Sequence, residues 1–354
     1  MTEILFTLLA LLALLWAIAL LYLSGPDLSA FDQPIGQSCN SAKEPSEELK
    51  AVVASFSGIF PTLKRTPLSQ HLALLRNYFD NIFPVTETST RFTAIDAGGV
   101  RAEWVQAPNV DSGRRLLYIH GGAYAVCSPK SHRRLTAKLS EIANAAVLAI
   151  DYRLMPEHAR MAGIEDCRSS YRWLLDNGPD GPAPANAVFV AGDSAGGNLT
   201  LSLIAWVRDQ GLRAPNAAVA LSPQTDGTLG SPSLKNNLAT DPLLGPLFKS
   251  LIRIPRTMLL WGTWLLTRIR PCDPVVSPVF GDLAGLPPLL VQASEAEMLR
   301  DDSRRYVNKA IAAGSPVTLQ TWRHMVHVWQ IFYPELPEGR EAVEEIGKFL
   351  RAHS

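Results

Sequence analysis

From about Ala94 to the C-terminus, short aliphatic runs alternate with longer segments of helical periodicity. Parallel strands need a crossover connection, usually a helix, so this alternation predicts an α/β fold with a mostly parallel sheet flanked by helices. Asp96-Ala97-Gly98-Gly99 is typical of a hairpin turn and would add an antiparallel edge. The expected strands are residues 91–95, 100–105, 116–119, 145–150, 187–191, 217–221, 288–293 and 317–322, and the expected helices are residues 131–143, 163–177, 195–210, 299–313 and 338–352.

The composition excludes several classes of protein. With 47% hydrophobic and 19% charged positions, the 354 residues can bury one large core or two modest ones, which fits neither disorder nor a coiled coil. The 33 basic and 33 acidic residues cancel, so no overall field attracts nucleic acid. The four cysteines are too widely spaced for a zinc or redox motif, and no strand leads into G-x-G-x-x-G, so we expect neither a metal nor a cofactor.

The N-terminus carries a long apolar segment. Residues 4–23 contain no charge, and at about 1.5 Å of rise each they would cross a hydrocarbon core of roughly 30 Å. A cleaved signal peptide is the alternative, but Glu3 stands where a basic residue is usual and no good cleavage site follows. We therefore expect residues 1–23 to be a single-pass membrane anchor. The first basic residue is Lys43, so the side of the membrane stays open.

Two segments interrupt the alternation of strands and helices. Residues 24–90 begin with a polar stretch at 37–50 and continue into helical patterns at 47–58 and 69–82, so we interpret them as a tether and N-terminal cap helices. Residues 225–274 are rich in Pro and Gly, and we interpret them as a cap insertion within a catalytic domain at 91–354.

A strand leads into Gly192-Asp193-Ser194-Ala195-Gly196, and a helical pattern follows. G-x-S-x-G in this context is typical of a strained turn that exposes a nucleophilic serine, because side chains at the flanking glycines would collide with backbone. The alternative is an ordinary turn in which Ser194 only caps the helix. The pattern makes Ser194 the candidate nucleophile.

A second strand ends in His120-Gly121-Gly122. Two glycines let the backbone curl so that successive N–H groups point at one spot, as a developing oxyanion requires. We predict an oxyanion hole formed by the amides of Gly121, Gly122 and Ala195. An ordinary turn is the alternative for this motif taken alone.

These motifs are parts of a longer resemblance. HGGAY at 120–124, DYRLMPEH at 151–158 and GDSAGG at 192–197 resemble the signature blocks of the hormone-sensitive lipase family of α/β-hydrolases, which include bacterial esterases and arylacetamide deacetylase-like carboxylesterases. The similarity runs from about residue 100 to residue 349. It implies a carboxylic ester hydrolase of the α/β-hydrolase fold with a Ser-acid-His triad and a helical cap. Ala123 and Cys127 depart from the glycines usual in this family, and residues 159–161 from its aromatic-proline run.

The remaining triad members should follow Ser194 in the order acid and histidine, each after a strand. The family's acid aligns with Glu297. The competing acids are Glu295, Asp301 and Asp302, which stand in the same stretch.

Two histidines follow the last strand. His327, directly before Val-Trp-Gln, matches the family's catalytic base, while we interpret His324 as an exposed loop residue. In the second signature block we interpret Asp151, Arg153 and Glu157 as ion pairs that brace a loop, and His120 as a supporting hydrogen-bonding residue.

The sequence thus predicts a membrane-anchored serine carboxylesterase that hydrolyses short- to medium-chain or lipid-derived esters through an acyl-enzyme. A lactone or amide hydrolase with the same triad, or a non-catalytic relative that binds small molecules, are the alternatives. Besides the ester substrate, we expect membrane lipid to contact residues 4–23. Residues 247–270 are either a cap segment buried against the core or a second lipid contact, with Trp261 and Trp264 at the level of the headgroups.

Overall fold

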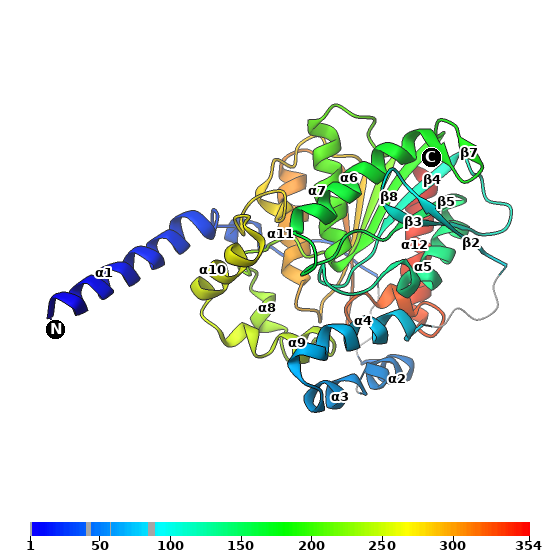
Figure 1. Cartoon of the computed structure of the whole chain (residues 1–354). Helices are drawn as coiled ribbons and strands as arrows, with labels where there is room; N and C mark the ends of the chain where they lie inside the picture. Colours follow the sequence, from blue (N-terminus) through cyan, green and yellow to red (C-terminus); the bar gives the residue numbers. More distant parts are fainter. Residues whose placement is uncertain (1, 40–43, 57, 84–88) are drawn as a thin grey trace.

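The computed structural model describes residues 2–39, 44–56, 58–83 and 89–354 (Figure 1). Its centre is a nine-stranded sheet with the order β1-β11-β10-β9-β8-β4-β5-β3-β2. The strands are β1 (Gln37–Ser38), β2 (Arg91–Asp96), β3 (Arg101–Gln106), β4 (Arg114–Ile119), β5 (Ala146–Ile150), β8 (Ala187–Asp193), β9 (Ala217–Leu221), β10 (Leu289–Ser294) and β11 (Val317–Trp322). A separate two-stranded ribbon joins β6 (Asn177–Gly178) and β7 (Gly181–Pro182).

The sheet has the predicted α/β-hydrolase architecture. Neighbouring strands from β1 to β5 are parallel, whereas β3 runs antiparallel to both β5 and β2. The hairpin expected at residues 96–99 is present, since the Ala97 N–H donates to the Val100 carbonyl at 2.7 Å. Strand β1 was not predicted, because two residues are too few to show a periodicity.

Helices cover both faces of the sheet (Figure 1). One face carries α5 (Pro129–Ala143) and α12 (Pro337–Ala352), and the other carries α6 (Arg160–Asp176), α7 (Ser194–Asp209) and α11 (Arg300–Ala312). The periodicity of α12 shows why it packs there: Val343, Ile346 and Leu350 recur on one side of the helix, and all three are buried in the core. Each of these helices was predicted to within three residues.

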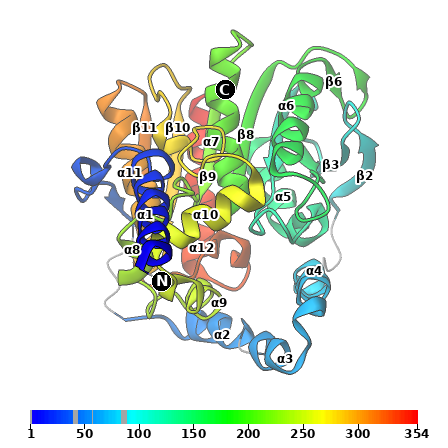
Figure 2. The same ribbon diagram turned by 60° about the vertical axis from the view of Figure 1, so that its left-hand side comes forward.

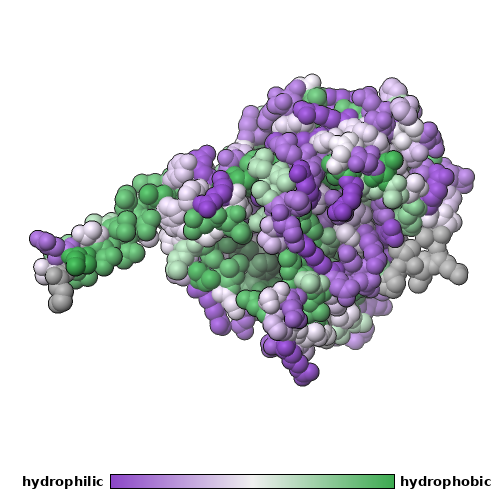
Figure 3. Space-filling model, in the orientation of Figure 1, coloured by the Kyte–Doolittle hydropathy of each residue, from purple (hydrophilic) through white to green (hydrophobic). Residues whose placement is uncertain are grey.

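The N-terminal helix extends away from the body (Figure 1). Helix α1 (Thr2–Ile18) continues into the π-helix η1 (Ala19–Leu23), and together these 22 residues are long and apolar enough to cross a membrane. Figure 3 shows apolar side chains along most of this projection, whereas polar and apolar side chains alternate over the body. Its role as an anchor stays a prediction at this point.

Cap helices lie on the side of the body where the parallel strands end (Figures 1 and 2). The N-terminal segment supplies α2 (Glu47–Phe56), α3 (Ile59–Arg65) and α4 (His71–Asn81), and the insertion between β9 and β10 supplies α8 (Ser233–Asn236), α9 (Leu244–Phe248), η4 (Leu251–Arg253) and α10 (Arg256–Thr267). Residues 40–43 of the predicted tether lie outside the described residues. The proposed division of the chain at residues 23 and 90 stays a prediction. The short 3-10 helices are η2 (Ser29–Phe31), η3 (Leu68–Gln70), η5 (Pro278–Phe280) and η6 (Trp329–Phe332).

Candidate active site

Ser194 stands at the junction of β8 and α7, in the strand–turn–helix expected from its motif. Its φ of 51° lies in the left-handed region, which is unusual for a residue other than glycine. The turn is tight because the backbone of Gly196 approaches β4 so closely that a Cβ there would overlap the Ile119 carbonyl oxygen. The turn therefore fixes Ser194 through backbone packing against the core.

The structure brings Ser194, His327 and Glu297 together. The Ser194 hydroxyl lies 2.8 Å from Nε2 of His327, and Nδ1 of His327 lies 2.7 Å from Oε2 of Glu297. Burial of His327 would lower its pKa, but the hydrogen bond and the charge of Glu297 raise it above the ordinary value. Because the ionised carboxylate can only accept, Nδ1 donates to Glu297 and Nε2 is left to accept the Ser194 proton.

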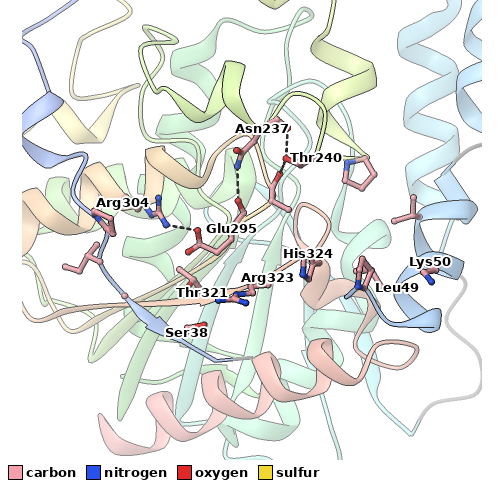
Figure 4. A pocket seen from close by; sticks show the side chains of 17 residues that line it. Ser38, Leu49, Lys50, Asn237, Thr240, Glu295, Arg304, Thr321, Arg323 and His324 are labelled. Atoms are coloured by element: carbon pink, nitrogen blue, oxygen red, sulfur yellow. Dashed lines mark hydrogen bonds and ion pairs between the residues drawn. The ribbon is translucent and has the colours of Figure 1, made fainter. Parts of the chain in front are cut away.

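The competing acids and the competing histidine lie elsewhere. Glu295 pairs with Arg304 at 2.6 Å. It lines a second pocket, separate from the cavity above Ser194 that is described below, and His324 lines the same pocket (Figure 4). Asp301 pairs with Arg300 at 2.8 Å. Asp302 is buried and accepts hydrogen bonds from the backbone N–H groups of residues 225 and 226. These contacts give the three competing acids structural partners away from Ser194, and His324 lines the pocket beside Glu295.

The second pocket, of about 960 Å³, shows how the cap insertion supports the loop that carries Glu297 (Figure 4). The Asn237 side-chain amide donates to the carbonyl oxygens of Glu295 and Glu297, at 2.9 and 2.8 Å. Asp241 accepts from the Met298 N–H at 2.9 Å. The position of Glu297 therefore depends on residues more than fifty positions earlier in the chain, a dependence that no local motif indicates.

Residues 120–127, here the oxyanion loop, differ from expectation at Gly121. The Gly121 N–H donates to Oδ1 of Asp193 at 3.0 Å, so it does not face a reacting carbonyl. This corrects the prediction that Gly121 supplies an oxyanion donor. No hydrogen bond of the Gly122, Ala123 or Ala195 amides is seen among the residues that the structure describes. Ala123, with a φ of 51°, is a loop residue that the sequence analysis noted only as a departure from the family's glycine.

Asp193 is the centre of a buried network that the motif analysis also missed. Its Oδ1 accepts from the Tyr118 hydroxyl at 2.7 Å and lies 3.2 Å from Nε2 of His132. Burial would raise the pKa of Asp193, but His132 and the hydrogen bonds lower it below the ordinary value. Burial would likewise lower the pKa of His132, and Asp193 raises it. Asp193 and His132 therefore favour each other's charged form, next to Ser194 and the oxyanion loop.

His120 has the supporting role that was predicted. Its Nδ1 donates to the Gly121 carbonyl at 2.7 Å, and its ring stacks on Tyr152 with centroids 4.4 Å apart. Burial and the neighbouring His132 lower the pKa of His120 to about 3, so the ring stays neutral. A neutral, enclosed imidazole of this kind fixes the loop conformation.

Ion pairs fix the second signature block, as expected, and a backbone hydrogen bond joins the block to the oxyanion loop. Arg153 pairs with Asp166 at 2.7 Å, and Asp151 pairs with Arg101 at 3.0 Å. The Met155 N–H donates to the Tyr124 carbonyl at 2.8 Å, which attaches the block to the loop.

Arg76 of the cap helix α4 contacts both segments. Its Nε donates to the Ala125 carbonyl at 2.8 Å, and Nη2 donates to the Met155 carbonyl at 3.1 Å. Both terminal nitrogens also reach the Glu157 carboxylate at 2.8 Å, which lowers the pKa of Glu157 to about 2. The N-terminal cap is thereby connected to the oxyanion loop by a side chain that the sequence did not single out.

An apolar cavity of about 560 Å³ opens above Ser194 and His327. In Figure 3 apolar side chains surround a hollow on the face of the body that carries the cap helices. The described residues include no group of three His, Cys, Asp or Glu side chains that could hold a metal ion. The cavity walls come from α4, the cap insertion and η6, and include Leu72, Leu75, Phe79, Leu247, Phe248, Leu251, Ile252, Ile331 and Phe332.

Known proteins are similar to this chain in sequence and in fold. A family model described as an α/β-hydrolase fold matches residues 116–331. The chain is 43% identical to an acetyl-hydrolase of Streptomyces hygroscopicus over 257 residues, which are 73% of this chain and 81% of that protein. It is 33% identical to a carboxylesterase/phospholipase of Mycobacterium tuberculosis, over 73% of this chain and 68% of that protein. A solved esterase from the bacterial hormone-sensitive lipase family aligns with a TM-score of 0.74 and 34% identity, over 88% of this chain and 99% of that one.

Proposed function

The chain belongs to the hormone-sensitive lipase-like esterases of the α/β-hydrolase fold, and on that premise we propose that it is a membrane-anchored serine carboxylesterase with Ser194 as its nucleophile. The observation that carries the proposal is the hydrogen-bonded chain from Ser194 through His327 to Glu297, with distances of 2.8 and 2.7 Å. These are the contacts that serine activation needs.

Acylation begins when Ser194 Oγ attacks the ester carbonyl carbon and His327 Nε2 takes the hydroxyl proton. Glu297 stabilises the imidazolium that forms and keeps the ring oriented, without taking the proton. Collapse of the tetrahedral intermediate breaks the bond to the alcohol oxygen, and His327 gives its proton to that oxygen. The alcohol leaves, and the acyl group stays on Ser194.

Deacylation repeats these steps with water. His327 takes a proton from the water as its oxygen attacks the acyl carbon, and then returns the proton to Ser194 Oγ as the carboxylic acid departs. Both tetrahedral intermediates carry a negative oxygen, and in this proposal the amides of Gly122, Ala123 and Ala195 donate hydrogen bonds to it. Removal of one such donor typically costs on the order of a hundredfold to a thousandfold in rate.

The cavity indicates the class of substrate. Its walls are aliphatic and aromatic, and a volume of about 560 Å³ suits an acyl chain of short to medium length or the apolar part of a lipid-derived ester. The apolar helix at Thr2–Leu23 supports the membrane part of the proposal, since it projects from the body with almost no burial.

The test is an acyl-chain-length series of p-nitrophenyl esters on the detergent-solubilised full chain, beside the Ser194→Ala variant. We expect ester turnover that Ser194→Ala abolishes, together with loss of organophosphonate labelling, because no other oxygen occupies the turn. His324→Ala is the matched control and should keep both. Labelling of Ser194→Ala at the wild-type rate would overturn the assignment, and turnover of anilides or lactones in place of esters would assign the triad to the alternative substrates.

A further inference from the structure

The end of the apolar helix packs against the cap insertion. Ala19 and Leu23 are 0% and 1% exposed and form a cluster with Leu260, with Trp261 and Trp264 packed around it. Figure 2 shows α1 beside α10. The two indoles, for which the sequence left burial against the core or contact with lipid headgroups open, therefore contact the N-terminal helix.

The chain that follows is also fixed to the body. The Arg270 guanidinium lies 4.9 Å from the centroid of the Tyr22 ring. Gly25 has a φ of 70°, and a Cβ there would come within 2.8 Å of side-chain atoms of Cys272 and Phe280. The junction is too close-packed for a hinge, so the direction of the apolar helix fixes the orientation of the body.

The depth of α10 follows from helix geometry. Residues 4–23 span roughly 30 Å, about the thickness of a hydrocarbon core. All twenty residues are therefore needed to cross the bilayer. The Trp261 indole N–H donates to the Leu15 carbonyl at 3.1 Å. Leu15 lies eight residues before Leu23, or roughly 12 Å along a helix. If the apolar stretch crosses the bilayer, the cap helix beside its last turns lies within one leaflet.

The outer side of α10 has the chemistry for that position. Met258, Leu265 and Leu266 are 63%, 52% and 68% exposed, although all three are large apolar side chains. Residues 242–272 contain no acidic side chain, and Arg253 and Arg268 are exposed at the two ends of α10. An apolar side bounded by arginines is the pattern of a helix that lies 5–10 Å into the interface of an anionic bilayer, on the order of the depth estimated above.

We propose that α10 is immersed in the leaflet at which the N-terminal helix ends, so that the bilayer is the surface that covers Met258, Leu265 and Leu266. This rests on the proposed membrane anchor and names the partner of the cap. The consequence for the reaction comes from the segment just before α10: Leu247, Phe248 and Ile252 line the cavity above Ser194. A lipid-derived ester can thus pass from the leaflet into the cavity along apolar side chains.

The test uses the full chain in vesicles of phosphatidylcholine and phosphatidylglycerol, with p-benzoylphenylalanine replacing single residues. The test positions are Leu266 and Met258. Leu12 in α1 is the positive control. Ile95 of β2, which is 38% exposed at the edge of the sheet farthest from α1, is the negative control (Figure 1). After irradiation, mass spectrometry measures the yield of peptide joined to phospholipid.

We expect lipid adducts at Leu266 and Met258 to approach the yield at Leu12 and to exceed the yield at Ile95 by about tenfold. Yields at both test positions equal to that at Ile95 would overturn the immersion, because the body would then stand clear of the bilayer. If Leu12 also forms no adduct, the membrane anchor itself is wrong and the immersion fails with it. Hydrolysis of a soluble p-nitrophenyl ester by each variant separates these outcomes from misfolding and tests the esterase activity independently.

Discussion

Replacement of Asp193 by Asn tests whether a buried charge holds the oxyanion loop. All three donors meet one carboxylate oxygen: the Tyr118 hydroxyl at 2.7 Å, the Gly121 N–H at 3.0 Å and Nε2 of His132 at 3.2 Å. Asparagine keeps an oxygen at this place and nearly the same shape. The substitution therefore removes the charge and leaves the packing.

The size of the effect follows from the three hydrogen bonds. A hydrogen bond to a charged group contributes about 1.5–3 kcal/mol and one between neutral groups about 0.5–1.5 kcal/mol, so about 1 kcal/mol is lost per bond and about 3 kcal/mol in all. Since each 1.36 kcal/mol is a factor of ten, even part of this loss in the transition state lowers kcat by about tenfold to a hundredfold. KM should change little, because the aliphatic and aromatic side chains of the cavity walls are untouched.

The assay is steady-state hydrolysis of a soluble p-nitrophenyl ester together with denaturant unfolding in detergent. Glu103→Gln is the matched control, because Glu103 is also buried and accepts three hydrogen bonds from Arg133. Glu103 stands on β3, which is three strands away from β8 in the sheet. It should lose stability and keep kcat. If Asp193→Asn keeps the wild-type kcat while its stability falls, the charge serves the fold alone and the reasoning about the loop is refuted.

Four further substitutions have defined outcomes. Since Glu297 raises the pKa of His327 against burial, Glu297→Gln should lower kcat by orders of magnitude and move the acidic limb of kcat/KM to lower pH; an unmoved limb would contradict this. His327→Ala should cost several orders of magnitude in kcat and His324→Ala less than about tenfold, and the reverse ranking would exchange their roles. Burial and Asp226 raise the pKa of Asp302 to about 7, so the native state binds more protons than the unfolded state between about pH 4 and pH 7, and stability falls as pH rises through that range. Asp302→Asn should flatten this fall in thermal unfolding midpoints, and equal slopes would count against it.

Local periodicity predicted most of the framework, because the spacing of apolar residues decides which face of a strand or helix is buried. The turn at Ser194 was predictable because its glycines and its nucleophile are neighbours in the chain and form a local motif. The Gly121 amide was assigned wrongly because its acceptor, Asp193, approaches it only in the folded sheet. Asp193 stands inside the motif, yet nothing in the motif shows which donors its carboxylate meets.

Cap residues that support the site across long separations were missed. Arg76 reaches a loop 49 positions later, and Asn237 supports the Glu297 loop 60 positions later. Neither belongs to a motif, because each contact depends on how the cap packs. The packing of Trp261 on the N-terminal helix was not predicted for a related reason: an apolar pattern shows that a side chain will be covered, without showing by what.

These contacts show that different parts of the fold hold the different catalytic groups in place. Ser194 is held by the core, through the backbone of β8 and α7, whereas the other groups are held partly by the cap. Arg76 donates to the oxyanion loop at Ala125, and Asn237 donates to the loop of Glu297. A movement of either cap segment would therefore displace the oxyanion donors or the acid while leaving the nucleophile in place. Helix α10 belongs to the same insertion as Asn237 and packs on the N-terminal helix. A shift of the N-terminal helix would therefore also move the insertion that positions Glu297.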